Sequence, residues 1–177
     1  MTVAAETAAS RGHTVRMKRW LACALAAAPI PTPIGFGPRY QLPPGPPVGT
    51  SLACSRVDAE RERAHVELFA NKLVLLLPKG IGVARGCTYP VRTTDPTGVV
   101  EFVPGARPTL ADLFDVWGQP LSARGFAGFR GAVSAWVGGK RWPGDVRGIP
   151  LRRHAEIVVE VGGYIPPHTF FLFPPAR

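Results

Sequence analysis

A proline-rich stretch divides the chain and limits where a folded domain can begin. Eight prolines stand between Pro29 and Pro47. Proline fixes φ and lacks a backbone donor, so a segment this rich in proline favours extended polyproline geometry over helix or sheet. We therefore expect residues 29–53 to form a linker and residues 54–177 to form a single folded domain.

The segment before the prolines has the pattern of an export signal. From Met17, basic residues precede a short apolar run, Trp20 to Ala28, which is too short to span a bilayer. This pattern predicts a leader over residues 1–28, with Met17 as the true start, and a secreted or otherwise extracytoplasmic protein. A cytoplasmic protein with an apolar N-terminus is the alternative.

Two of the three cysteines fall inside the expected domain. Cys23 lies in the leader, which leaves Cys54 and Cys87 as an even pair. In an oxidising compartment such a pair usually forms a disulfide, and no C-x-x-C spacing points to zinc or thiol redox chemistry. We expect a Cys54–Cys87 disulfide, with two free buried thiols as the alternative.

Short apolar segments separated by turn residues predict strands. Residues 64–70 and 73–78 read as one hairpin, and residues 87–91 and 98–103 read as a second pair around the turn "RTTDPT". Residues 131–142 turn at Gly138-Gly139. In "HAEIVVEVG", residues 154–162, polar residues alternate with apolar ones, which predicts a half-buried strand with its His and Glu side chains facing solvent.

One helix is expected between the strands. Thr109 is a candidate N-cap with Asp112 three residues later, apolar residues follow at helical spacing, and Gly118 and Pro120 end the pattern. The sequence thus predicts an α+β domain with an antiparallel or mixed sheet of about six short strands. A β-grasp-like roll is the first expectation and a β-sandwich is the second.

The positive charge of the chain does not predict nucleic-acid binding. The formal net charge is +9, but residues 54–177 carry 16 Lys and Arg against 11 Asp and Glu, and these are scattered. We therefore expect no specific nucleic-acid partner.

Several motifs together resemble a known group of proteins. The order "HVELFANKLVLLLPKGIGV", "CTYPVRTTDPTGVVEFV", "TLADLFDVWGQPL" and "IPLRRHAEIVVEVG" is similar to an uncharacterised family of small exported bacterial proteins. The resemblance covers nearly all of the expected domain. In that family the first strand carries an H-x-H pattern and the turn after the cysteine carries H-T-H-D, which implies a divalent-metal site, because imidazoles at alternating strand positions share one side of a sheet.

This chain departs from the histidine-rich pattern at the turn. His65 and Asp95 remain, but Arg92 and Thr94 stand where the resemblance implies the two turn histidines. Arginine does not ligate metals, and its charge repels a cation. We therefore expect no cofactor and no bound metal, and we expect Arg92 to pair instead with Asp95 or with Glu67.

The candidate ligand-binding residues are His65, Arg92, Asp95 and His154, and no catalytic motif is present. The first hypothesis is an exported, disulfide-stapled binding domain without catalysis, which contacts a protein or cell-envelope partner through its aromatic C-terminal segment "YIPPHTFFLFPP". The second is a divalent-metal protein whose site is degenerate relative to the histidine-rich family. The third is a cationic surface protein that binds acidic polymers.

Overall fold

The computed structural model describes residues 40–174, so the expected leader over residues 1–28 and Met17 lie outside the described residues. The described strands are β1 (Tyr40–Gln41), β2 (Glu62–Ala70), β3 (Leu73–Leu76), β4 (Val83–Ala84), β5 (Cys87–Thr88), β6 (Val91–Arg92), β7 (Val99–Phe102), β8 (Leu121–Ser122), β9 (Gly125–Phe126), β10 (Phe129–Arg130), β11 (Val133–Val137), β12 (Lys140–Arg141) and β13 (Glu156–Val161). The helices are α1 (Leu110–Trp117) and the 3-10 turns η1 (Pro104–Ala106) and η2 (Val146–Gly148). None of the helices in this part is long and apolar enough to cross a membrane.

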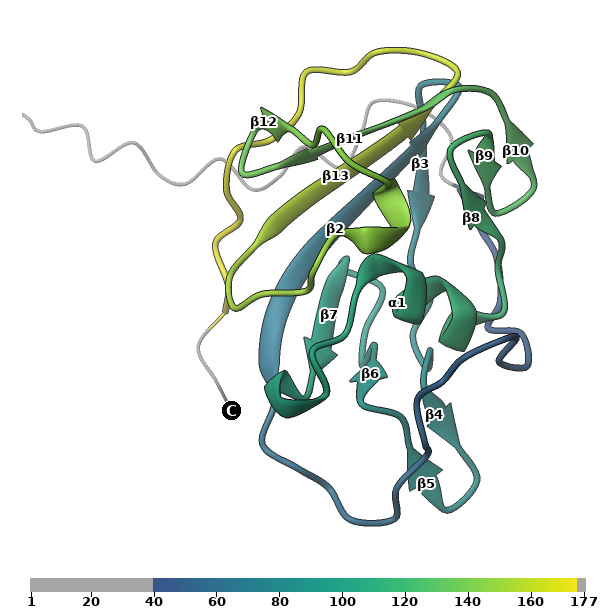
Figure 1. Cartoon of the computed structure of the whole chain (residues 1–177), viewed down its shortest axis with the longest axis vertical. Helices are drawn as coiled ribbons and strands as arrows, with labels where there is room; N and C mark the ends of the chain where they lie inside the picture. Colours follow the sequence, from purple (N-terminus) through teal and green to yellow (C-terminus); the bar gives the residue numbers. More distant parts are fainter. Residues whose placement is uncertain (1–39, 175–177) are drawn as a thin grey trace, which may run out of the picture.

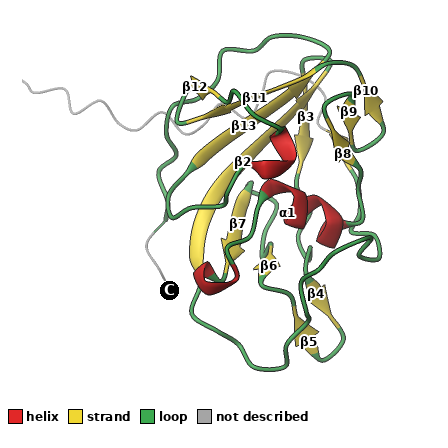
Figure 2. Ribbon diagram, viewed as in Figure 1, coloured by secondary structure: helices red, strands yellow, loops and turns green. Residues whose placement is uncertain are grey.

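Eight strands form one mixed sheet around β2 (Figure 1). On one edge, β2 pairs antiparallel with β7 through its first half and with β3 through its last residues; on the other edge it pairs parallel with β13. The expected α+β class is confirmed, since one α-helix accompanies a predominantly β structure (Figure 2). The sheet is larger than the expected six strands because β1 and β12 extend its two ends.

Local sequence explains the hairpin between β2 and β3. Asn71 and Lys72 form its turn, and both have positive φ, 51° and 64°. Two consecutive residues of this kind match the twist of the flanking strands, and asparagine tolerates the left-handed region better than most residues. The first expected hairpin is therefore confirmed.

The helix α1 begins and ends where the sequence predicts. Asp112 accepts hydrogen bonds from the backbone N–H of Thr109 at 2.7 Å and from its hydroxyl at 2.8 Å. Gly118 ends the helix with φ 75°, a conformation that costs glycine little. The apolar side of α1, including the fully buried Phe114 and Trp117, belongs to the same core cluster as the sheet.

The central strands present two different faces. One, which we call the helix face, packs into the main core with α1 and carries the side chains of Ala64, Val66, Leu68, Ile157 and Val159. The other carries His65, Glu67, Phe69, Glu156, Val158 and Glu160, because neighbours along a strand point to opposite sides. Residues 163–174, which we call the strap, contact this second face, so we call it the strap face.

A disulfide joins Cys54 to Cys87, with the two Cα atoms 5.6 Å apart and a sequence separation of 33. The pairing expected from the cysteine count is thus present. It indicates an oxidising, extracytoplasmic environment, because disulfides rarely persist in the cytosol.

The second half of the expected linker runs along the domain. In residues 40–53, β1 pairs with β3, and the N–H groups of Gly45 and Val48 donate to the carbonyls of Trp117 and Asp115 at 2.9 and 2.8 Å. These contacts hold residues 40–53 against the domain. The first half of the expected linker, residues 29–39, lies outside the described residues.

Candidate functional site

Three buried polar side chains meet on the strap face. His65 and Glu67 are two residues apart on β2, and Glu156 lies directly opposite His65 on β13. Their residue exposures are only 3%, 9% and 2%. Burying charged or polar groups costs free energy unless they are paired, so a cluster of this kind needs internal partners or a bound ion.

Both ring nitrogens of His65 have partners. Nδ1 lies 2.8 Å from Glu156 Oε2 and 3.1 Å from Oε1, while Nε2 lies 3.0 Å from the Thr97 carbonyl oxygen. A carbonyl oxygen only accepts, so Nε2 carries a proton and donates it to Thr97. In the neutral ring the lone pair is then on Nδ1, which points at the Glu156 carboxylate. A backbone carbonyl behind the ring is the arrangement that orients metal-ligating histidines.

The two carboxylates of the cluster are close to each other and poorly solvated. Burial raises the pKa of Glu156, the hydrogen bond and charge of His65 oppose that rise, and the nearby Glu67 adds to it. Glu67 has its own partner, because its Oε2 lies 2.6 Å from Nδ1 of His168 on the strap. Each carboxylate therefore shares a hydrogen with one histidine.

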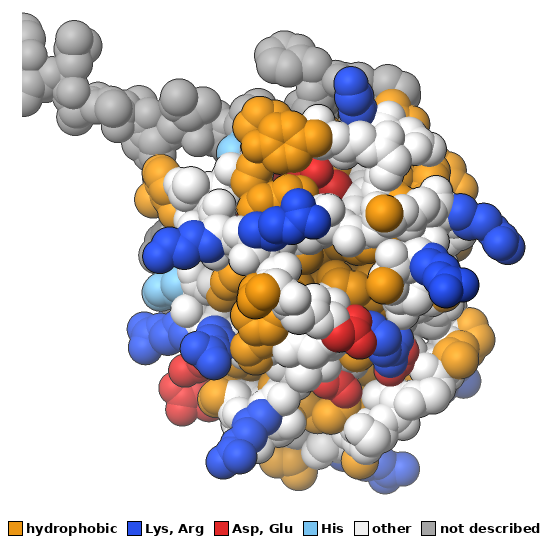
Figure 3. All heavy atoms as spheres, turned by 45° about the horizontal axis from the view of Figure 1, so that its top comes forward, with side chains coloured by type: hydrophobic (Ala, Val, Ile, Leu, Met, Phe, Trp, Pro, Cys, Tyr) orange, Lys and Arg blue, Asp and Glu red, His pale blue; other side chains and the backbone are white. Residues whose placement is uncertain are grey.

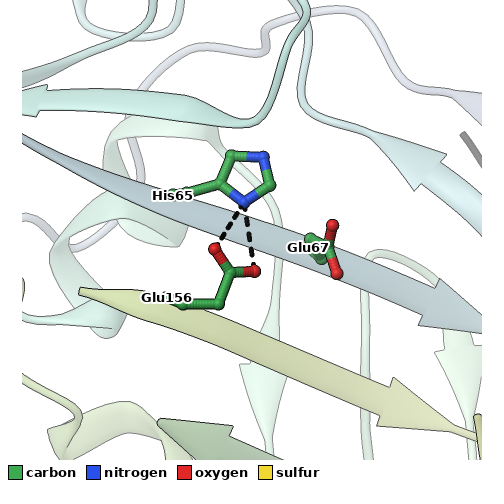
Figure 4. A group of neighbouring side chains, drawn as sticks. All are labelled: His65, Glu67 and Glu156. Atoms are coloured by element: carbon green, nitrogen blue, oxygen red, sulfur yellow. Dashed lines mark hydrogen bonds and ion pairs between the residues drawn. The ribbon is translucent and has the colours of Figure 1, made fainter. Parts of the chain in front are cut away.

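The geometry suits a metal ion with only small movements. One ligand-type atom from each of His65, Glu67 and Glu156 lies within 4.8 Å of the others (Figure 4). In a tetrahedral zinc site with bonds of about 2.1 Å, two ligand atoms lie about 3.4 Å apart. The three atoms must therefore approach one another by at most about 1.4 Å, which rotation of their side chains can supply.

Sequence reasoning missed Glu156 and the role of Glu67. The expectation that the polar residues of 154–162 face solvent is wrong for Glu156 and Glu160, because all six residues of β13 are buried, and it is correct for His154, which is exposed. Alternation of polar and apolar residues indicates that the two faces of a strand differ, but it does not show that the polar face is exposed to solvent. The signal that was present is the aromatic segment after this strand, which covers the polar face.

Arg92 and Asp95 do not join this cluster. Arg92 Nε donates to Glu101 at 2.7 Å and its Nη1 donates to Asp58 at 3.3 Å, so the expected pairing with Asp95 or Glu67 is wrong. The β6–β7 pairing explains this, because it places Arg92 directly opposite Glu101. Asp95 instead caps its own turn by accepting from the backbone N–H and the hydroxyl of Thr97.

The turn after Cys87 is largely scaffold. Thr93 is fully buried; its hydroxyl accepts from the N–H of Ile81 at 3.1 Å and donates to the Pro78 carbonyl at 2.6 Å.

The exposed His154 has φ 58° in the turn before β13, and its ring stacks on Phe173 with centroids 4.7 Å apart. Of the four candidate residues, the buried cluster therefore contains only His65.

Glu160 is a second buried carboxylate on the strap face, at 3% exposure. Its Oε1 accepts from the N–H of Ile165 at 3.1 Å, and it lines a small polar pocket with Ser134, Trp136 and Arg141. Burial raises the pKa of Glu160, and the hydrogen bond from Ile165 partly opposes the rise. The folded state therefore binds this proton more tightly than the unfolded state does.

We expect Glu160→Gln to stabilise the protein at pH 8 and to have little effect near pH 4. A raised folded-state pKa contributes stability that is complete below the unfolded value of 4.5 and is lost as the pH rises through the folded value. Glutamine keeps the acceptor for Ile165 and cannot ionise. Urea unfolding of both proteins at the two pH values measures the difference, and a variant less stable than wild type at pH 8 would contradict the expectation.

The basic side chains of the face drawn in Figure 3 do not form one patch. Lysine and arginine are spread there among uncharged, hydrophobic and acidic side chains. Several arginines of the described residues also have acidic partners, among them Arg92 and Arg147. No family model, curated protein or solved structure matches the chain.

Proposed function

We propose that this is an exported, disulfide-stapled domain that binds one divalent transition-metal ion of the zinc class through His65, Glu67 and Glu156. The observation that carries the proposal is the meeting of these three buried ligand-type side chains within 4.8 Å. The resemblance to a histidine-rich exported family supports the same chemistry, although here the ligands lie on β2 and β13 and not in the turn at Arg92.

Charge balance favours a dication in this site. Glu67 and Glu156 place two carboxylates in a buried region, and the charge of Glu67 contributes to the raised pKa of Glu156. A metal ion with two positive charges neutralises both and replaces the hydrogen that now lies between His65 and Glu156. Metals must displace such protons to bind, so the same residues that pair in the metal-free protein become ligands.

The donor set selects among metals. One imidazole nitrogen with two carboxylate oxygens is a common set for zinc and its first-row neighbours, whereas Mg²⁺ and Ca²⁺ prefer oxygen ligands throughout. Phe171 stacks on the His65 ring with centroids 3.7 Å apart, so the strap covers the ligands. A covered site suits metal storage, transfer or structural stabilisation better than hydrolysis, which needs an open coordination position.

The test is zinc titration of the oxidised, metal-free protein by calorimetry at pH 7.5, with Mg²⁺ and Ca²⁺ as competitors. We expect one zinc per chain, and we expect Glu67→Gln to weaken binding at least about 100-fold, since even the partners of metal ligands contribute about 10–100-fold. Glutamine preserves the size of Glu67 and its acceptor for His168, so the variant removes mainly the charge.

Glu160→Gln is the matched control for this experiment. It makes the same substitution at another buried glutamate of the strap face, outside the three-residue cluster. We expect it to bind zinc as the wild type does, within about 3-fold. Absence of stoichiometric zinc binding by the wild type, or equal weakening by both variants, would refute the proposed site.

A further inference from the structure

The strap lies along the strap face from one end to the other. Tyr164 contacts Trp136 with ring centroids 6.0 Å apart, His168 reaches Glu67, and Phe171 stacks on His65. Phe173 then reaches His154, just before β13. In Figure 1 the chain accordingly turns back after β13 and returns toward the start of that strand. The strap therefore passes directly over the three proposed ligands.

Side chains hold the strap in place. Residues 163–174 form no strand and make no backbone–backbone hydrogen bond within the described part of the chain. Two polar contacts join the strap to the sheet: the N–H of Ile165 donates to Glu160, and the ring of His168 hydrogen-bonds with Glu67. Segments without a backbone ladder open at low free-energy cost, so the docking of the strap is sensitive to single contacts.

His168 is placed as a ligand would be. Its Nδ1 lies 2.6 Å from Glu67 Oε2, and Glu67 is itself a member of the three-residue cluster. The side chain is 30% exposed, so it has room to rotate. A metal ion between His168 and Glu67 replaces the shared hydrogen in the same way as at His65 and Glu156.

We infer that His168 is the fourth ligand of the metal site and that metal binding fastens the strap onto the sheet. This inference rests on the proposed function. Four ligands, His65, Glu67, Glu156 and His168, complete the tetrahedral set that closed zinc sites use. The coupling is reciprocal. If a docked strap raises the affinity for the metal by some factor, bound metal raises the equilibrium constant for docking of the strap by the same factor.

The test compares zinc binding by wild type, His168→Ala and His154→Ala. His154→Ala is the control, because its ring also contacts the strap but lies outside the cluster. We expect His168→Ala to lose at least about 10-fold in zinc affinity and His154→Ala to lose less than about 3-fold. His168→Ala also leaves the buried Glu67 without its partner in the metal-free protein, so we expect a lower melting temperature, and the zinc affinities are compared at a temperature at which all three proteins are folded.

Amide hydrogen exchange of residues 163–174, with zinc or with a chelator, supplies the second readout. We expect zinc to slow exchange in this segment in the wild type and in His154→Ala, but not in His168→Ala. If the wild type binds zinc and His168→Ala binds it equally well, or the strap exchanges at the same rate with and without zinc, this inference fails and the three-ligand site stands. If the wild type binds no zinc, both fail.

Discussion

Replacing Cys54 and Cys87 together by serine is expected to lower the free energy of unfolding by about 3–4 kcal/mol. The disulfide closes a loop with a sequence separation of 33, and cross-linking a loop of that length removes about this much conformational entropy from the unfolded chain. For a domain of this size the loss corresponds to roughly 10–15 °C in melting temperature.

The folded structure around the disulfide should survive the change. Ser55 and Thr88, the neighbours of the two cysteines, exchange backbone hydrogen bonds of 2.9 and 2.8 Å, and Arg61 donates to the Tyr89 carbonyl at 3.1 Å. The loss is therefore expected mainly through the unfolded state. Denaturant unfolding followed by tryptophan fluorescence measures it, with chemically reduced wild type as the control; a loss below about 1 kcal/mol would contradict the loop-entropy account.

The local features of the fold follow from the sequence. The turn at Asn71-Lys72 and the helix between Thr109 and Gly118 each depend on a few adjacent residues whose backbone preferences are strong. The disulfide was also predictable, because two cysteines in an expected extracytoplasmic domain have one way to pair.

The site depends on contacts between residues far apart in the sequence. His65 and Glu156 are 91 positions apart and meet because β2 and β13 pair in parallel, a register that no local pattern specifies. The strap then buries a face whose polar residues resemble those of a solvated strand. Arg92 likewise pairs with Glu101 because the register between β6 and β7 places the two residues opposite each other. Pairing of distant strands decided each of these partners.

The largest effect within the site is expected from breaking the His65–Glu156 pair. In the metal-free protein, His65→Leu leaves the buried Glu156 carboxylate without its imidazole, and Glu156→Leu leaves the His65 ring facing an apolar side chain. Removing one partner of a buried pair costs about 3–5 kcal/mol, because the remaining polar group loses both water and its partner. We expect each single variant to be destabilised by that amount.

The double variant His65→Leu/Glu156→Leu is expected to be more stable than either single variant. Two apolar side chains directly opposite on β2 and β13 leave no unpaired side chain at this position, and such replacements of buried pairs are often close to neutral. Urea unfolding with a chelator present gives the double-mutant cycle, and we expect a coupling energy of at least about 2 kcal/mol. Additive single effects would mean that the two residues do not stabilise each other.

Zinc is expected to stabilise only the wild type among the four proteins. Binding to the folded state alone raises the free energy of unfolding, and each variant lacks at least one ligand.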